Sequence, residues 1–241
     1  MMENILLDSV TFSYGKKETI RRFSLSFGKG EFCALIGPNG AGKSTILKLC
    51  SGILKPQSGK IKLFNKDLEG YPSKERAGLV SYLPQLLDTN VSFKVMELAE
   101  MGLYPRGGGL SPDEAIGVAG LKEKAGYSIT ELSAGEKRRA FFAMLLVQGA
   151  KTLLLDEPLS HLDIKYQVEL VKLLKDIIEK SGITVVMAVH DINTVFQFQK
   201  VCVIKDGTLF AAGSPGEIIT KGLIREVFEV EAENLLPQRI L

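Results

Sequence analysis

The sequence predicts an α/β fold, in which a mainly parallel β-sheet is covered by helices on both faces. Continuous apolar runs at residues 31–36, 152–155 and 183–189 are typical of buried parallel strands, and helical patterns separate them. Residues 3–30 alternate between polar and apolar side chains, which predicts an additional β region. Residues 86–150 are mostly helical in pattern. Because no low-complexity linker or repeat interrupts the 241 residues, we expect a single domain with a helical insertion.

The first half of the chain is expected to place strands on either side of one helix. Residues 3–30 break at Gly15 and again at Gly28 and Gly30, which predicts short strands and a hairpin. The apolar strand at residues 31–36 then runs directly into a glycine-rich segment. The elements expected after it are a helix over residues 43–53, stopped near Gly52 and Pro56, and strands over residues 60–65 and 79–83.

The second half alternates helices with buried strands. Ser111 and Glu114 have the spacing of a capping box, with Pro112 at the first helical position, so a helix is expected to begin there. Asp206 and Gly207 predict the turn of a hairpin. The other elements expected here are helices over residues 93–101, 136–147 and 164–180, the hairpin over residues 200–211, and final helices that begin near Ser214.

Charge and composition argue against several classes of protein. The chain carries 30 basic and 28 acidic residues, a net charge of +2, so nucleic acid is not expected as its main partner. No apolar run approaches the roughly 18 residues of a membrane span, and no secretory signal is visible. The three scattered cysteines, Cys33, Cys50 and Cys202, are interpreted as small buried side chains in a reducing compartment. We therefore expect a cytoplasmic protein.

The strongest motif is a phosphate-binding loop between a predicted strand and a predicted helix. Its glycines allow backbone N–H groups to wrap around phosphate oxygens, Lys43 neutralises phosphate charge, and the Ser44 hydroxyl is a Mg²⁺ ligand. A glycine-rich turn without function is the alternative, and the Lys43-Ser44 pair in this context argues against it. The nucleotide-binding candidates of this loop are Gly37, Pro38, Asn39, Gly40, Ala41, Gly42, Lys43, Ser44 and Thr45.

Two adjacent carboxylates follow the buried strand at residues 152–155. Asp156 is suited to bind Mg²⁺ through water. Glu157 is suited to polarise an attacking water as a general base, a contribution typically worth ~10²–10⁴ in rate. An ordinary acidic turn before Pro158 is the alternative, which is less consistent with a phosphate loop elsewhere in the same chain.

A second anion-binding helix start is predicted at residues 132–136. Ser133 and Glu136 form a capping-box pattern, and Gly135 leaves the backbone open to a phosphate. Taken alone, this pattern describes many ordinary helix starts. From the residues alone, Gln85 reads as a surface glutamine. A lone histidine is more often structural than catalytic, but His190 ends a predicted parallel strand, where ligands collect.

Taken in this order, the motifs resemble those of the ATP-binding subunits of ABC transporters, over nearly the whole chain. The resemblance implies a P-loop NTPase (RecA-like) core with a mainly parallel sheet, an antiparallel β subdomain and an α-helical subdomain. It implies one ABC ATPase domain over residues 1–241, in which residues 86–147 form the helical subdomain between residues 1–85 and 148–241. It also implies ATP and Mg²⁺ as cofactors, ATP hydrolysis coupled to transport, and a homodimer held together through ATP. The implied partners are transmembrane permease subunits and, indirectly, a substrate-binding protein, which would place the chain at the inner face of the cell membrane.

The resemblance also assigns roles that the residues alone leave open. Gln85 corresponds to a glutamine that senses Mg²⁺ and the γ-phosphate, and His190 to a histidine that contacts the γ-phosphate and orients the attacking water. Asp163 would lie at the dimer interface. Tyr14 would stack on adenine, although an ordinary strand aromatic is the alternative.

Residues 132–136 correspond to a segment that, in this family, caps the nucleotide held by another subunit. Ser133 and Gly135 would be its phosphate-facing pair, whereas Ala134 and Glu136 replace the more usual glycine and glutamine. His161 replaces a more common alanine beside Asp163.

Three further segments, at residues 156–164, 101–107 and 212–218, resemble the ATPases of importers for iron-siderophores, haem and cobalamin. These segments are less specific than the ATPase motifs, and cargo contacts would lie on partner chains. The ATPase of another importer, the ATPase of an exporter, and a soluble non-transport ABC ATPase stay open as alternatives. We also expect residues 85–106 to form the surface that meets the permease.

Overall fold

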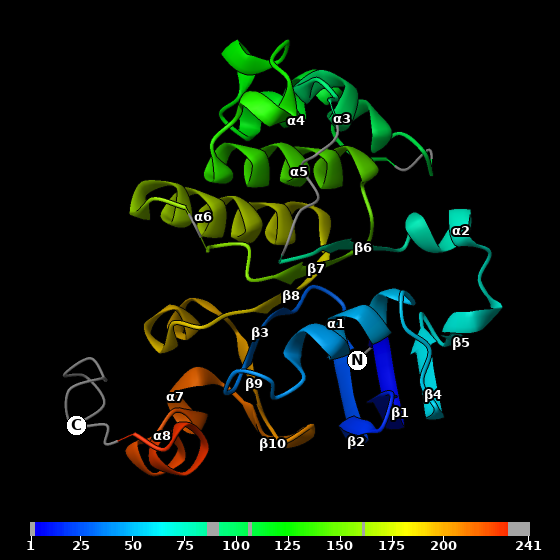
Figure 1. Ribbon diagram of the computed structural model, residues 1–241, viewed down its shortest axis with the longest axis vertical. Coiled ribbons are helices and arrows are strands. Elements are labelled where there is room, and N and C mark those ends of the chain that lie inside the picture. Colours follow the sequence, from blue (N-terminus) through cyan, green and yellow to red (C-terminus); the bar gives the residue numbers. More distant parts are fainter. Residues whose placement is uncertain (1–2, 86–91, 106–107, 161, 231–241) are drawn as a thin grey trace.

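The computed structural model contains two β-sheets (Figure 1). It describes residues 3–85, 92–105, 108–160 and 162–230. The larger sheet has six strands, in the spatial order β10 (Thr208–Gly213), β9 (Lys200–Lys205), β3 (Phe32–Ile36), β8 (Thr184–Ala188), β7 (Thr152–Asp156) and β6 (Val80–Leu83). From β9 to β6 every neighbouring pair is parallel, and β10 alone pairs antiparallel. The predicted mainly parallel sheet is confirmed.

The smaller sheet is antiparallel. Its four strands are, in spatial order, β2 (Lys17–Gly28), β1 (Glu3–Tyr14), β4 (Ser58–Leu63) and β5 (Lys66–Asp67). The prediction of short strands was wrong here, because β1 and β2 form one long hairpin of 12 residues on each side. The strand expected over residues 60–65 ends early, because Phe64 and Asn65 take positive φ angles of 48° and 64° and turn the chain into β5.

The helices begin and end largely where their sequence signals predict. Gly52, Gly149 and Gly182 each take a left-handed conformation directly after a helix, the usual C-terminal stop for an α-helix. Gly52 therefore ends the first helix at Ser51, before the predicted residue 53. The α-helices are α1 (Lys43–Ser51), α2 (Ser73–Ala77), α3 (Val95–Met101), α4 (Pro112–Val118), α5 (Ala134–Gln148), α6 (Ile164–Ser181), α7 (Pro215–Ile218) and α8 (Lys221–Phe228). Among the described residues, no helix is both long enough and apolar enough to cross a membrane.

Two hydrophobic cores lie on opposite faces of the larger sheet. In β3, Phe32, Ala34 and Ile36 face the core shared with α5, α6 and α8, whereas Cys33 and Leu35 face the core shared with α1 and the antiparallel sheet. This alternation is the strand period of two residues, and it explains why β3 is apolar throughout. Figure 1 shows α3, α4 and α5 gathered at one end of the long axis and α8 at the other.

The parallel arrangement brings four chain segments to one edge of the sheet. β3 ends at Ile36, β6 at Leu83, β7 at Asp156 and β8 at Ala188, and the register pairs these strands over their last residues. Because parallel strands point the same way, the residues that follow them meet at the carboxyl edge, where α/β sheets bind ligands. Every catalytic candidate predicted from the sequence follows one of these four strands.

Candidate functional site

The loop from β3 to α1 is shaped by glycines that no other residue could replace without strain. Gly37 has a φ of 150°, and a Cβ at this position would lie 2.1 Å from the carbonyl oxygen of Ile204. Gly42 has a φ of 109°, and its Cβ would lie 2.6 Å from Ile20 Cδ1. These contacts press the loop against β9 and β2, and they leave its backbone N–H groups as the natural ligands of an anion at the start of α1.

Lys43 is held within this loop by its own backbone. Its Nζ donates hydrogen bonds to the carbonyl oxygens of Gly37 at 2.7 Å and Pro38 at 3.1 Å, and the residue is only 6% exposed. Burial lowers the pKa of the Lys43 ammonium, and the nearby Glu157 and Asp156 carboxylates oppose that shift. The ammonium is therefore a poorly hydrated positive charge, which interacts strongly with an incoming anion.

Asp156 lies behind Ser44 at the end of β7. The Ser44 hydroxyl donates to Oδ1 at 3.0 Å, and the Tyr82 hydroxyl donates to Oδ2 at 3.1 Å. Asp156 is 1% exposed, and burial raises the pKa of its carboxyl group while these two hydrogen bonds oppose the rise. A buried carboxylate beside a hydroxyl is an all-oxygen donor set, the kind that a hard divalent cation prefers.

Glu157 follows β7, and its side chain contacts one residue that follows β6 and one that follows β8. Gln85 Nε2 donates to Glu157 Oε2 at 2.6 Å, and His190 Nε2 contacts Oε1 of the same carboxylate. Glu157 is buried and has a φ of 51°, a left-handed conformation that is uncommon for a residue with a long side chain. Its carboxylate faces the same cavity as Lys43, so it can accept a proton from a water placed there.

These groups surround an open cavity of about 760 Å³ at the carboxyl edge of the sheet. Tyr14 stands at its rim, with its ring in an edge-to-face contact with Phe12 at 4.9 Å and nearly half of its surface exposed. Among the predicted residues of the phosphate loop and the end of β7, four do not line the cavity: Gly37, Pro38, Ala41 and Asp156. Asp156 lies behind Ser44, to which it is hydrogen-bonded. The predicted residues that line it are Tyr14, Asn39, Gly40, Gly42, Lys43, Ser44, Thr45, Gln85, Glu157 and His190.

Ser133, Gly135 and Asp163 are not part of this cavity. Ser133 caps α5 and forms the predicted capping box: its Oγ accepts from the Glu136 N–H at 3.3 Å, and Glu136 returns a bond to the Ser133 N–H. Lys124 binds Glu136 at 2.6 Å, and this bond is the main cause that lowers the pKa of Glu136 to about 2. Ser133 and Asp163 are both exposed, so both are free to meet another molecule. His161 lies outside the described residues.

A family model described as ABC transporter matches residues 20–160, which is more than half of the chain. The chain belongs to the ABC transporter family. It is an ATPase of the ABC type, whose hydrolysis of ATP serves transport.

Known ABC proteins are similar to this chain over nearly its whole length. The iron(3+)-hydroxamate import ATP-binding protein FhuC of Bacillus subtilis (strain 168) is 34% identical over 242 residues, covering 96% of this chain and 90% of that protein. The hemin import ATP-binding protein HmuV of Rhodopseudomonas palustris (strain BisB18) is 36% identical over 254 residues, covering 97% and 94%. Among solved structures, CbiO1 of Clostridium perfringens, part of the ABC transporter complex CbiONQ, aligns with a TM-score of 0.76, 28% identity and 94% coverage of each chain.

Four residues of this ABC site were not predicted from the sequence. Lys17 and Thr19, on β2, line the cavity, and Tyr82 binds Asp156. Arg138, on α5, donates hydrogen bonds to the backbone carbonyls of Gln85 and Glu157. Tyr82 belongs to the predicted strand that ends just before Gln85, but nothing in that strand marks it as a site residue. No local pattern identifies Lys17, Thr19 or Arg138, because their positions depend on how distant elements pack.

Proposed function

We propose that this chain is the ATP-hydrolysing subunit of an importer for a metal chelate, such as an iron-siderophore complex, haem or cobalamin. The observation that carries the catalytic part is the Glu157 carboxylate, held by Gln85 and His190 in the cavity that also contains Lys43. The import part is supported by FhuC and HmuV, two import ATP-binding proteins at 34% and 36% identity over nearly the full length. In the proposed organisation the whole chain is one cassette, with residues 86–147 as its helical subdomain.

In the proposed complex, ATP lies along the loop from β3 to α1. The backbone N–H groups of residues 37–45 and the Lys43 ammonium bind its phosphates, since a helix N-terminus and a buried cation both favour an anion. The adenine stacks on Tyr14, whose exposed ring stands at the rim of the cavity and is braced by Phe12.

Mg²⁺ fits the donor set beside this loop. Ser44 and Asp156 supply a hydroxyl and a buried carboxylate whose oxygen atoms lie 3.0 Å apart, and Gln85 adds an amide oxygen at the cavity. Mg²⁺ in phosphate sites is usually held by one or two protein groups together with phosphate oxygens and water. When bound, the ion neutralises charge on the transferred phosphoryl group.

The hydrolytic step is assigned to the residues around Glu157. Glu157 accepts a proton from the attacking water, Gln85 orients the Glu157 carboxylate through its 2.6 Å hydrogen bond, and His190 contacts the γ-phosphate and orients the water. Lys43 stabilises the negative charge of the phosphoryl group, as an electrostatic contribution that is already in place before the reaction.

A second copy of the chain completes the proposed site. Ser133 and Gly135 lie at the N-terminal end of α5, where helix ends favour anions, and neither residue reaches the cavity of its own chain. Asp163 is likewise exposed before α6. In a head-to-tail dimer the Ser133 helix start of one copy covers the phosphates bound by Lys43 of the other, so ATP lies between the two chains.

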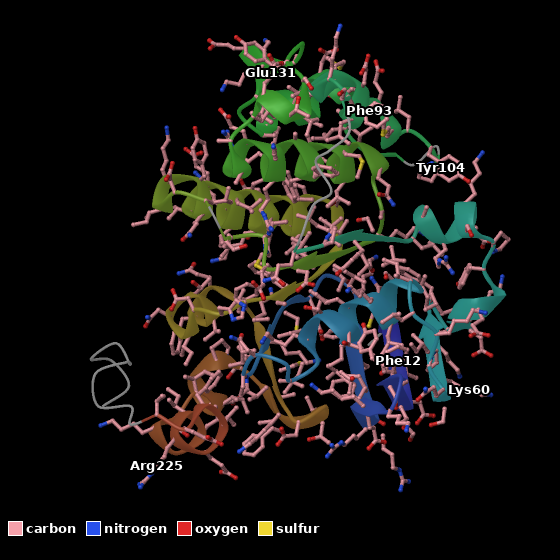
Figure 2. All side chains as sticks on the ribbon, in the orientation of Figure 1. Phe12, Lys60, Phe93, Tyr104, Glu131 and Arg225 are labelled. Carbon is pink, nitrogen blue, oxygen red and sulfur yellow. The ribbon has the colours of Figure 1, made fainter. Side chains whose placement is uncertain are left out.

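The proposed permease surface lies at the end of α3. Met101, Leu103 and Tyr104 are apolar yet exposed, and Tyr104 is 63% exposed beside Lys74 of α2. Figure 2 shows Tyr104 at the outer edge of the molecule, close to α2. Exposed apolar groups of this kind mark partner sites. Residues 86–91 and 106, which also belong to the predicted surface, lie outside the described residues.

Charged substitutions on this surface are expected to separate assembly from catalysis. Met101→Glu, Leu103→Glu and Tyr104→Glu each place a charge where an apolar partner must dock, so co-purification with the permease should be lost while basal ATPase activity stays within about twofold of wild type. Val118→Glu, at an exposed apolar position of α4, is the matched control and should assemble normally. Normal assembly of all three variants would contradict the assignment of this surface.

Import itself can be tested in the source cell. Deleting the gene is expected to reduce uptake of a radiolabelled iron-siderophore complex, haem or cobalamin to background, and the wild-type chain should restore it. Glu157→Gln should not restore uptake, because import requires hydrolysis. Unchanged uptake of all three chelates in the deletion strain would contradict the cargo class, and measurable ATPase activity of the purified chain would still support the enzymatic part.

A further inference from the structure

Arg138 connects three elements of the site without lining the cavity. It lies on α5, five residues after Ser133, and is 4% exposed. One terminal nitrogen of its guanidinium donates to the backbone carbonyl of Gln85, which follows β6. The other donates to the carbonyl of Glu157, after β7, with a longer bond of 3.5 Å to the carbonyl of Asp156. One side chain therefore ties α5 to the ends of two neighbouring strands.

The environment of Arg138 is costly for a cation. Burial lowers the pKa of the guanidinium, and the carboxylates of Glu157 and Asp156 only partly oppose this effect. Within the part of the chain that the structure describes, its hydrogen-bond acceptors are neutral carbonyl groups, so no ion pair with them compensates directly for the lost hydration. An apolar residue of similar length would fill the same space between α5 and the sheet, which makes specific orientation a better explanation for this arginine than stability.

Arg138 hydrogen-bonds to the backbone of Glu157, which has an unfavourable left-handed conformation. The left-handed φ of 51° at Glu157 costs energy for a non-glycine residue and persists only when neighbours hold it. Its carbonyl accepts from Arg138 and from the Ser160 Oγ at 2.8 Å, and its N–H donates to the Ala188 carbonyl at 3.2 Å. The same guanidinium fixes the carbonyl of Gln85, whose side chain holds the Glu157 carboxylate.

We propose that Arg138 is a positioning residue for ATP hydrolysis: it fixes the backbones of Gln85 and Glu157 relative to each other, so that the amide of one aligns the carboxylate of the other. This inference rests on the proposed role of Glu157 as the general base. Arg138 does not line the cavity, so its removal is expected to change the rate of hydrolysis and not the affinity for ATP.

The first test compares Arg138→Met with Arg138→Lys. Arg138→Met is expected to lower kcat by about 10–100-fold, equivalent to about 1.4–2.7 kcal/mol at the standard conversion, with KM for ATP within about threefold of wild type. Arg138→Lys keeps donors within reach of the two carbonyls and should recover at least a tenth of wild-type kcat. Arg139→Met is the matched control: Arg139 bonds the carbonyls of Ala119 and Gly120 and stacks on Tyr166, so kcat should change by less than about threefold.

The second test repeats the change in a Glu157→Gln background. If Arg138 acts only through Glu157, the double variant should hydrolyse ATP no more slowly than Glu157→Gln alone, within about twofold, and should still form an ATP-dependent dimer. An equal loss in both backgrounds, a raised KM with unchanged kcat, or a wild-type kcat in Arg138→Met would each overturn the proposal. A failure of the general-base assignment is distinguishable, because Glu157→Gln would then keep wild-type activity. Thermal unfolding of each variant shows whether it is folded. If Arg138→Met does not fold, the kcat of Arg138→Lys is compared with wild type instead.

Discussion

Glu157→Gln is expected to lower ATP hydrolysis by about 10²–10⁴-fold, the usual contribution of a general base, and to leave ATP binding intact. Glutamine has nearly the shape of glutamate, and its carbonyl oxygen can still accept the hydrogen bond that Gln85 now gives to Glu157 at 2.6 Å. Because bound ATP is no longer consumed, the head-to-tail dimer should accumulate. Phosphate release measures the first effect, and light scattering at saturating MgATP measures the second.

The control for this change is Glu217→Gln. Glu217 is a glutamate in a different setting: it forms a capping box with Ser214 at the start of α7, and it lies outside the cavity. Its replacement should leave hydrolysis within about twofold of wild type. A Glu157→Gln chain that stays monomeric at saturating MgATP would count against a dimer held by ATP, and one that retains full hydrolysis would remove Glu157 from its proposed role.

Lys43→Ala and Ser133→Arg are expected to inactivate the enzyme in different ways. Lys43→Ala removes the buried ammonium that we propose binds the phosphates, and it should weaken ATP binding by at least about 10–100-fold, since a hydrogen bond to a charged group contributes about 1.5–3 kcal/mol. Ser133→Arg should retain binding, because Ser133 lies outside the cavity of its own chain, but should lose hydrolysis, because the larger side chain blocks the approach of the second copy. Binding of a fluorescent ATP analogue separates the two defects.

The two variants also provide a complementation experiment. In a mixture, the heterodimer contains one site with an intact Lys43 from one chain and an intact Ser133 from the other, so ATPase activity should reappear on mixing. Ser111→Arg is the matched control, because it removes an equivalent capping serine from α4 and should keep full activity. Full hydrolysis by Ser133→Arg alone would contradict a site shared between chains.

The sequence was most informative where local chemistry requires one backbone geometry. The loop between β3 and α1 was predicted from its glycines and the Lys43-Ser44 pair. In the structure, a Cβ at Gly37 or Gly42 would clash with a neighbouring strand, so the loop geometry requires glycine at both positions. The meeting of Glu157 and His190 followed from one general rule, that the ends of parallel strands share an edge. Both are consequences of short-range geometry or of strand direction.

What the sequence did not predict depends on packing between distant elements. The orientation of α5 against the sheet decides that Arg138 faces inward to Gln85, whereas Arg139 reaches the end of α4. Nothing in the pattern of adjacent arginines distinguishes the two. The roles of Ser133 and Asp163 pose a different difficulty, because both residues are exposed in a single chain and their proposed contacts require a second one.

The strand order also determines when this site can appear during protein synthesis. β3 carries the phosphate loop, but both of its neighbours, β8 and β9, come from residues beyond 183. A ribosome that adds about 5–20 residues per second needs on the order of 10–30 s to advance from β3 to β8, the first of these partners to be made. Throughout that interval β3 has no partner strand, and neither Glu157 nor His190 can be held beside Lys43 until the sheet closes. A nascent chain that ends before β8 therefore cannot form the complete site, and its apolar β3 lacks both neighbouring strands for most of translation.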